Sequence, residues 1–333
     1  MTMGPTVAVE QEHFIPGLDL GPYLRGEKGA LDPLTAALRE TCEKVGFFYI
    51  KNHGIPQDLI DRTFAASKRI HAMPVADKKA IAMNEQNIGY MGVNESIQGH
   101  SKVEVARKPN YNESFFFMRD RKPDDPDVMA KKPFRGLNLW PADLPGFRED
   151  ALAYQSAMEQ LGMKMLPVVA RALDLPVDFF LDYFNPANLQ TRFLHYPIRD
   201  ESVPDQYGAG AHTDAGFLTF LMQHGIGGLQ IRKTDGTWFD APVLPGKFLI
   251  NTGDLLRRWT NDRWLSTPHR VLNLSGTDRY SIAFFFGPDL DRVMSCLPSC
   301  QGPDNPAKHP PISYAQYKTE FVKANYFNQQ RKT

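Results

Sequence analysis

The stretch His212-Thr213-Asp214-Ala215-Gly216-Phe217-Leu218-Thr219 places an imidazole and a carboxylate two residues apart. Alternate residues of a β-strand project to the same face, so His212 and Asp214 on a strand can chelate one ion. His269 begins a second expected strand, within Ser266-Thr267-Pro268-His269-Arg270-Val271, and is the best candidate for a third ligand. The sequence therefore predicts a metal site held by His212, Asp214 and His269.

The chemistry of this ligand set narrows the choice of ion. Two neutral imidazoles and one carboxylate on one face are typical of non-haem Fe(II) oxygenases, in which coordination positions stay open for a co-substrate and dioxygen. The same three ligands could instead hold a zinc ion that activates water in a hydrolase. A His-x-Asp pair alone is weak evidence, so the surrounding sequence has to separate these alternatives.

Segments that follow the His-x-Asp pair carry a resemblance to a known family. In chain order they are Gly227-Gly228-Leu229-Gln230, Asn251-Thr252-Gly253-Asp254, Trp259-Thr260-Asn261, His269-Arg270-Val271 and Arg279-Tyr280-Ser281. Together with the Gly46-Phe47-Phe48 and Asn52-His53-Gly54 segments, they resemble the isopenicillin N synthase-like family of Fe(II)- and 2-oxoglutarate-dependent dioxygenases. The resemblance implies a mainly β fold with flanking helices, whose core is a double-stranded β-helix, or jelly roll. It also implies an enzyme that uses Fe(II), 2-oxoglutarate and dioxygen.

Arg279 and Ser281 are a second pair of functional candidates, because they too are two apart on an expected strand. A guanidinium beside a hydroxyl forms a receptor for a carboxylate, with geometric specificity from bidentate bonding. The family resemblance implies that this pair holds the distal carboxylate of 2-oxoglutarate. It also implies that Tyr196 adds a hydroxyl to the same carboxylate.

The substrate pocket is less well marked in the sequence. We expect it to involve Phe285, which shares a face with Arg279 and Ser281, and residues on neighbouring expected strands, namely Arg192, Leu194, Tyr111, Phe115 and Phe117. Leu194 is a departure from the family pattern, because many plant members carry asparagine two residues before the tyrosine. An assisting contact to the co-substrate is therefore expected to be missing.

The resemblance implies a dioxygenase that hydroxylates, desaturates or cyclises a small organic molecule, with release of succinate and carbon dioxide. One alternative is an oxidase of isopenicillin N synthase type, in which Arg279 and Ser281 grip a substrate carboxylate and no 2-oxoglutarate is used. Gln330 keeps this alternative open, because that oxidase has a glutamine near its own C-terminal end. The zinc hydrolase is a second alternative, although it leaves Arg279 and Ser281 without a role.

The rest of the chain gives the expected elements. Apolar residues recur at helical spacing after Asp32-Pro33 and in residues 57–71 and 147–173. Phe47-Phe48-Tyr49-Ile50 predicts a strand, and many short runs beyond residue 190, separated by turn residues, predict a sandwich or small barrel. We expect one oxygenase domain over 1–333, composed of a mostly helical region over 1–185, a jelly-roll core with the metal site over 186–290, and a C-terminal loop and helix over 291–333.

Composition excludes some classes of partner. Lys and Arg number 38 and so do Asp and Glu, which leaves no net field to recruit nucleic acid or an anionic membrane. The N-terminus carries acidic residues where a signal peptide needs a basic segment, and no later stretch is long enough to span a bilayer. Cys42, Cys296 and Cys300 are too few for a disulfide scaffold. We expect a cytoplasmic protein, a monomer or weak oligomer, whose partner is a small-molecule substrate.

Overall fold

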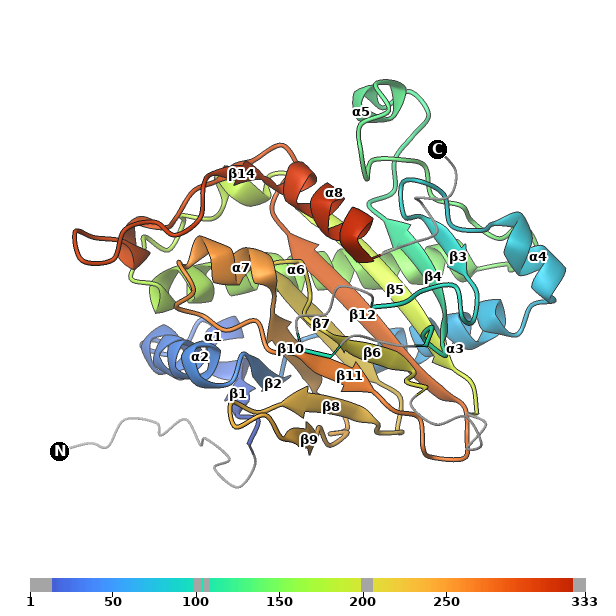
Figure 1. Ribbon diagram of the computed structural model, residues 1–333, viewed down its shortest axis with the longest axis horizontal. Helices are drawn as coiled ribbons and strands as arrows, with labels where there is room; N and C mark the ends of the chain where they lie inside the picture. The colour runs from blue at the N-terminus through green and yellow to red at the C-terminus, as the bar shows by residue number, and fades with distance from the viewer. Residues whose placement is uncertain (1–13, 99–102, 105–107, 199–205, 326–333) are drawn as a thin grey trace.

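Two facing β-sheets form the centre of the molecule (Figure 1). The computed structural model describes residues 14–98, 103–104, 108–198 and 206–325. The larger sheet has the order β1 (Gly17–Asp19), β2 (Phe47–Lys51), β10 (Phe248–Thr252), β7 (Leu218–Gln223), β12 (Arg279–Gly287), β5 (Asn188–Tyr196), β4 (Glu113–Met118) and β3 (Gly89–Met91). The smaller sheet has the order β6 (Ala209–His212), β11 (His269–Val271), β8 (Leu229–Arg232) and β9 (Trp238–Asp240). The jelly-roll expectation is confirmed.

Helices cover the outer face of the larger sheet. Both α3 (Gln57–His71) and α6 (Phe147–Ala172) contact β12, and α2 (Leu31–Lys44) packs on α6 and β2. In Figure 1, α6 crosses behind the strands of the larger sheet, while β6, β11, β8 and β9 lie on the near side. The other elements are α1 (Gly21–Leu24), α4 (Val75–Ala80), α5 (Pro126–Met129), α7 (Asp254–Trp259), α8 (Tyr314–Asn325), the short 3₁₀ turns 182–184 and 298–300, and the strand pair β13 (Val293–Met294) and β14 (Ile312–Ser313).

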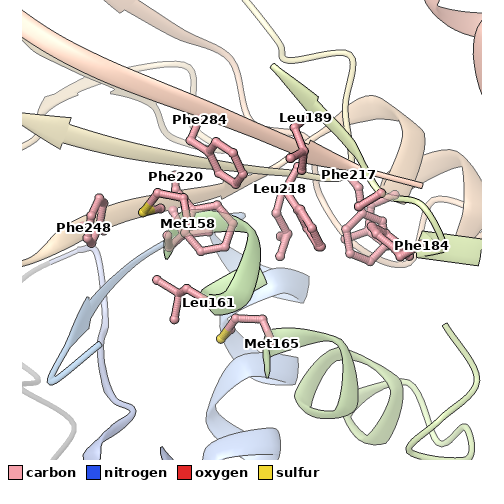
Figure 2. Close-up of a cluster of buried hydrophobic side chains, with 14 of the residues drawn as sticks. Met158, Leu161, Met165, Phe184, Leu189, Phe217, Leu218, Phe220, Phe248 and Phe284 are labelled. Carbon is pink, nitrogen blue, oxygen red and sulfur yellow. The ribbon is translucent and has the colours of Figure 1, made fainter. Parts of the chain in front are cut away.

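Alternate residues of the larger sheet serve two separate cores. On β12, Ile282, Phe284 and Phe286 belong to the core against the helices, whereas Ala283 belongs to the core between the two sheets. Figure 2 shows side chains of α6, among them Met158, meeting phenylalanines of the larger sheet. Because both faces are buried, the central strands read as nearly continuous apolar runs. The inner face is the one that carries the polar residues of the candidate site.

The expected elements are present, with small changes at their ends. The first long helix begins at Leu31, with Ala30 at its N-cap position, so the expected start, with Asp32 as the N-cap and Pro33 as the first helical residue, is two residues late. The terminal helix follows Ser313, whose hydroxyl accepts a hydrogen bond from the backbone N–H of Gln316 at 3.2 Å. The segment before residue 186 is not only helical, since it contributes β1 to β4 to the larger sheet. Within the part of the chain that the structure describes, no helix has the length and apolar character needed to cross a membrane.

Candidate metal centre and co-substrate site

The three predicted metal ligands converge at one end of the smaller sheet. His212 is the last residue of β6 and pairs directly with His269, the first residue of β11, so that their ring centroids are 4.4 Å apart. Asp214 lies beyond the end of β6, and its Oδ1 is 3.8 Å from Nε2 of each histidine. Asp214 therefore reaches the site from the turn after β6 and not, as the strand argument supposed, from the strand itself. One ligand atom of each residue lies within 4.8 Å of the others.

Backbone carbonyls orient the two imidazoles. Nδ1 of His212 lies 2.7 Å from the carbonyl oxygen of Gly210, and Nδ1 of His269 lies 3.2 Å from that of Thr267. Each contact requires Nδ1 to donate a hydrogen, which leaves Nε2 with a free lone pair. Both histidines therefore present the nitrogen that a metal ion needs.

The carboxylate is oriented in the same way by two side chains. Oδ2 of Asp214 accepts hydrogen bonds from Oγ1 of Thr219 at 2.6 Å and from Nδ2 of Asn251 at 2.8 Å. The other oxygen, Oδ1, faces the imidazoles. The sequence reasoning quoted Thr219 and Asn251 within the family segments but gave them no role, because only the pairing of β7 with β10 brings them together.

The protonation states at the centre suit metal binding. Burial and the neighbouring His269 lower the pKa of His212, so its imidazole is neutral. Burial alone would raise the pKa of Asp214, but the two imidazoles and the hydrogen bonds from Thr219 and Asn251 outweigh it and lower that pKa. A neutral imidazole and an ionised carboxylate are the forms that bind metal ions.

The turn that carries Asp214 is fixed by close backbone contact with the segment after β10. The backbone N–H of Asp254 donates to the carbonyl of Asp214 at 2.7 Å. Gly253 has no side chain to obstruct this approach, since a Cβ there would lie 2.2 Å from the carbonyl oxygen of Gly216. Any larger residue at 253 would push the turn away.

The second predicted pair lies on β12, within the core between the sheets. Arg279 is 0% exposed and Ser281 is 1% exposed. Nε of Arg279 donates to the carbonyl of Gly227 at 2.8 Å, and Nη2 donates to Oε1 of Gln223 at 3.1 Å. Tyr196 is paired opposite Arg279, with the guanidinium carbon 4.6 Å from its ring centroid. The structure thus brings the three predicted residues together.

Two polar atoms of this pair have no hydrogen-bond partner among the described residues, namely Nη1 of Arg279 and Oγ of Ser281. Burial lowers the pKa of Arg279, yet a guanidinium remains charged at any physiological pH. A buried charge without a counter-ion is costly, and buried polar atoms are normally satisfied. The arrangement fits a ligand carboxylate that accepts from both groups.

A cavity of about 810 Å³, counting its open mouth, lies beside the metal ligands. Of the residues expected in the substrate pocket, Arg192 and Phe285 line it. Phe115 and Phe117 do not, because they point to the helix face of β4, where both pack close to Trp140. Their neighbour Phe116 lines the cavity instead. The expectation for Phe115 and Phe117 is therefore corrected.

Two other expected pocket residues also lie elsewhere. Leu194 pairs with Ser281 and is buried in the core between the sheets. The backbone N–H of Tyr111 donates a hydrogen bond to the backbone carbonyl of Tyr207, and Tyr111 is not among the residues that line the cavity. The C-terminal helix α8 also lines the cavity, through Tyr314, Lys318, Phe321 and Val322. No pattern in the sequence marked that helix face as a cavity wall.

Comparisons with known proteins place this geometry in a family. Residues 15–143 match the family described as non-haem dioxygenase in morphine synthesis N-terminal, and residues 187–288 match the 2OG-Fe(II) oxygenase superfamily. A 2-oxoglutarate-Fe(II) type oxidoreductase from Emericella nidulans is 36% identical over 319 residues, which cover 93% of this chain and 90% of the relative. The chain belongs to the 2OG-Fe(II) oxygenase superfamily.

Other relatives of this oxygenase agree. Kihadalactone A synthase from Citrus sinensis is 32% identical over 292 residues, covering 85% of each chain. A full-length Neurospora crassa protein, solved in complex with alpha-KG and thymine, superposes with a TM-score of 0.83 at 25% identity, covering 96% of this chain and 99% of that protein. The structure of JOX2 with 2OG, Fe and JA superposes with a TM-score of 0.75 at 26% identity, covering 96% of this chain and 90% of JOX2.

The family confirms the expected reaction class. The protein is an Fe(II)- and 2-oxoglutarate-dependent dioxygenase with a jelly-roll core, whose cofactor is Fe(II) and whose co-substrates are 2-oxoglutarate and dioxygen. The oxidase and zinc hydrolase alternatives are not favoured by these relatives. Gln330, on which the oxidase alternative rested, lies outside the described residues.

Proposed function

We propose that His212, Asp214 and His269 hold the Fe(II) of this oxygenase, and that Arg279, Ser281 and Tyr196 hold the distal carboxylate of 2-oxoglutarate. The observation that carries the second assignment is the pair of unsatisfied buried atoms, Nη1 of Arg279 and Oγ of Ser281. A carboxylate that accepts from both would neutralise the buried guanidinium and satisfy the hydroxyl. The ligand chemistry and the free Nε2 atoms support the first assignment.

When bound, Fe(II) with 2-oxoglutarate and dioxygen supplies the oxidising power, and 2-oxoglutarate is converted to succinate and carbon dioxide. In this proposal the residues of the chain bind the co-substrate and orient the metal ligands. Arg279 and Ser281 fix one end of the co-substrate, while the paired strands β6 and β11 fix the two imidazoles. The apolar core around Tyr196 keeps water away from the ion pair, which strengthens it.

The substrate in this proposal is a small organic molecule that enters the cavity beside Asp214. Residues 1–333 act as one oxygenase domain, with the core at 186–290, a proposal supported by the sheet that the segments before and after residue 186 share. We further propose a cytoplasmic monomer or weak oligomer that binds neither nucleic acid nor membrane. The balanced charge and three free cysteines support it.

An anaerobic titration tests the two assignments together. Fe(II) followed by 2-oxoglutarate should produce the weak visible charge-transfer band of the chelate, and succinate should form when oxygen is admitted. Arg279→Ala should weaken 2-oxoglutarate binding by at least about tenfold, since a charge-assisted pair is lost, while iron binding is unchanged.

Arg148→Ala, at an exposed arginine on the helical side, is the matched control and should behave as wild type. If no band and no succinate appear, the site assignment fails. Equal loss of iron and 2-oxoglutarate in Arg279→Ala would show that Arg279 is structural.

A further inference from the structure

Two cationic side chains, Arg192 on β5 and Lys318 on α8, line the same cavity as His212 and Asp214. They come from distant parts of the sequence. Neither is part of the metal site or of the carboxylate receptor at Arg279. Their charges need a physical explanation.

Arg192 is held by neutral partners only. Its Nε donates to Oγ of Ser114 at 3.0 Å, its Nη2 donates to Oδ1 of Asn112 at 3.1 Å, and its guanidinium carbon lies 4.7 Å from the ring centroid of Phe116. These contacts fix the side chain and use one edge of the guanidinium. Nη1 donates to none of the described residues, so the fork that suits a carboxylate stays available.

Lys318 is buried, and among the described residues its ammonium group also contacts only uncharged partners. It is 7% exposed, its Nζ donates to Oε1 of Gln190 at 3.3 Å, and Nζ lies 4.7 Å from the ring centroid of Phe134. Burial lowers its pKa to about 7, which is the response expected when an ammonium lacks an anionic partner. The side chain is therefore poised to gain a proton and stability from an anion.

Lys318 reaches the strand that carries Arg192. Its partner Gln190 is two residues before Arg192 on β5, so the side chains of Gln190 and Arg192 project to the same face of the sheet. Within the described residues neither cation forms an ion pair with a carboxylate. The nearby acid, Asp214, is already engaged by the imidazoles, Thr219 and Asn251. Among the described residues, no carboxylate therefore neutralises the charge of Arg192 or the charge that Lys318 carries when it is protonated.

We propose that the substrate carries a carboxylate on a planar ring, with the carboxylate bound between Arg192 and Lys318 and the ring lying against Phe116 and Phe285. This inference rests on the proposed function for the position of iron and of 2-oxoglutarate. An anion explains why a half-buried arginine and a buried lysine line this cavity, since burying a charge without a partner is unfavourable. Aromatic side chains from β4, β12 and α8 are among the residues that line the cavity, which suits a flat apolar body.

A carboxylate, with two oxygens and a single negative charge, matches the donors that remain. Arg192 offers one free edge, which matches the two oxygens of a carboxylate, and Lys318 adds a single point charge. The second carboxylate receptor, at Arg279, lies in the core between the sheets and is assigned to 2-oxoglutarate. Substrate and co-substrate would thus be held by separate cations.

Calorimetric titration of the anaerobic protein loaded with Fe(II) and 2-oxoglutarate tests this inference. The probes are benzoate and 2-naphthoate, their amides benzamide and 2-naphthamide, and phenyl phosphate. We expect at least one acid to bind at least about tenfold more tightly than its amide, because the amide cannot pair with a charge. Lys318→Met and Arg192→Gln should each remove this preference and leave amide binding unchanged. Lys323→Met, at an exposed lysine on the same helix, should retain it.

The inference is overturned if acids and amides bind the wild-type protein equally, if no acid binds, or if both variants keep the preference. Tighter binding of phenyl phosphate than of benzoate would overturn the carboxylate assignment. The visible chelate band, recorded on the same samples, reports the proposed function separately. If the chelate band appears but acids bind no more tightly than amides, only the substrate inference is wrong. If the band is missing, the site assignment is wrong.

Discussion

At the scale of single residues, Asp214, the carboxylate of the proposed metal site, is oriented by two neighbouring side chains. Thr219 and Asn251 both donate to its Oδ2, which leaves Oδ1 for the metal. Without these donors the carboxylate would rotate freely and lose entropy on binding. Contacts of this kind tune metal affinity as well as ligand geometry.

Thr219→Val removes one donor with little change of shape. We expect Fe(II) affinity to fall by roughly 10-fold to 100-fold, while the fold is kept. Anaerobic metal titration followed by tryptophan fluorescence measures the change. Thr237→Val, in the exposed turn between β8 and β9, is the matched control and should bind iron as the wild type does. Unchanged affinity in Thr219→Val would show that Asn251 alone orients the carboxylate.

His71 is a second residue for which the surroundings set the protonation state. It is buried on α3, its Nδ1 lies 2.7 Å from the carbonyl oxygen of Ser67, and burial lowers its pKa from 6.5 to about 3. The native state therefore keeps this histidine neutral, while the unfolded chain protonates it near its ordinary pKa. Between about pH 6.5 and the lower folded value, the unfolded state binds more protons, so stability rises with pH through that window.

His71→Phe should flatten this dependence. On going from about pH 7 to about pH 5, the free energy of unfolding should fall more in the wild-type protein than in the variant, because only the wild type must bury a neutral His71. Denaturant unfolding of the metal-free proteins at each pH measures both slopes. Above about pH 8 the difference between the two proteins should be constant, since His71 is then neutral in both states. Parallel curves between about pH 7 and about pH 5 would contradict the assigned role of burial.

At the scale of elements, α6 is shaped to lie flat on the larger sheet. Gly162 faces β12, and a Cβ at that position would lie 2.8 Å from Cδ2 of Phe286. Glycine is unfavourable in a helix interior by up to about 1 kcal/mol relative to alanine. The close approach of helix and ring is the reason this glycine is tolerated.

Gly162→Ala should therefore destabilise the protein by about 1–3 kcal/mol, despite the better helix propensity of alanine. Denaturant unfolding gives the value, and Phe286→Leu in the same chain should recover part of it in a double-mutant cycle. Ser156→Ala, on the exposed face of the same helix, should change stability by less than about 0.5 kcal/mol. A more stable Gly162→Ala protein would mean that the ring moves aside without cost.

At the scale of the whole molecule, the segments before and after residue 186 fold together. β2 pairs with β10, and β4 pairs with β5, so the larger sheet is completed only by strands from the N-terminal region. The helices α2, α3 and α6, from the same region, cover its outer face. The two family matches, over 15–143 and 187–288, therefore both contribute strands to the larger sheet.

Residues 187–288 expressed alone should not fold cooperatively. The fragment would leave β5 and β10 as open edges and expose the apolar face that α6 covers, both of which favour aggregation. Thermal denaturation followed by circular dichroism should show no cooperative transition, and co-expression with residues 14–186 should restore one. A monomeric fragment with a sharp transition would show that the core is autonomous.

The sequence alone places some side chains on the correct face of a strand and fails to place others. Arg279 and Ser281 could be placed on one face because strand alternation is local and needs no partner strand. Phe115 and Phe117 could not be placed, because the Phe115 to Phe117 run is apolar on both faces of β4. A shift of one residue exchanges the faces, so only the pairing of β4 with β5 decides that Phe116 faces the cavity.

The sequence by itself determined the family and predicted the metal ligands and the carboxylate receptor, since these depend on residue identity and on spacing along one strand or turn. Only the tertiary structure decided which other side chains contact the proposed ligands and line the cavity. Thr219 and Asn251 meet Asp214 only through the pairing of β7 with β10, and Lys318 reaches the cavity only because α8 packs over it. Such contacts join residues far apart in the chain, and no local pattern encodes the register or docking that creates them.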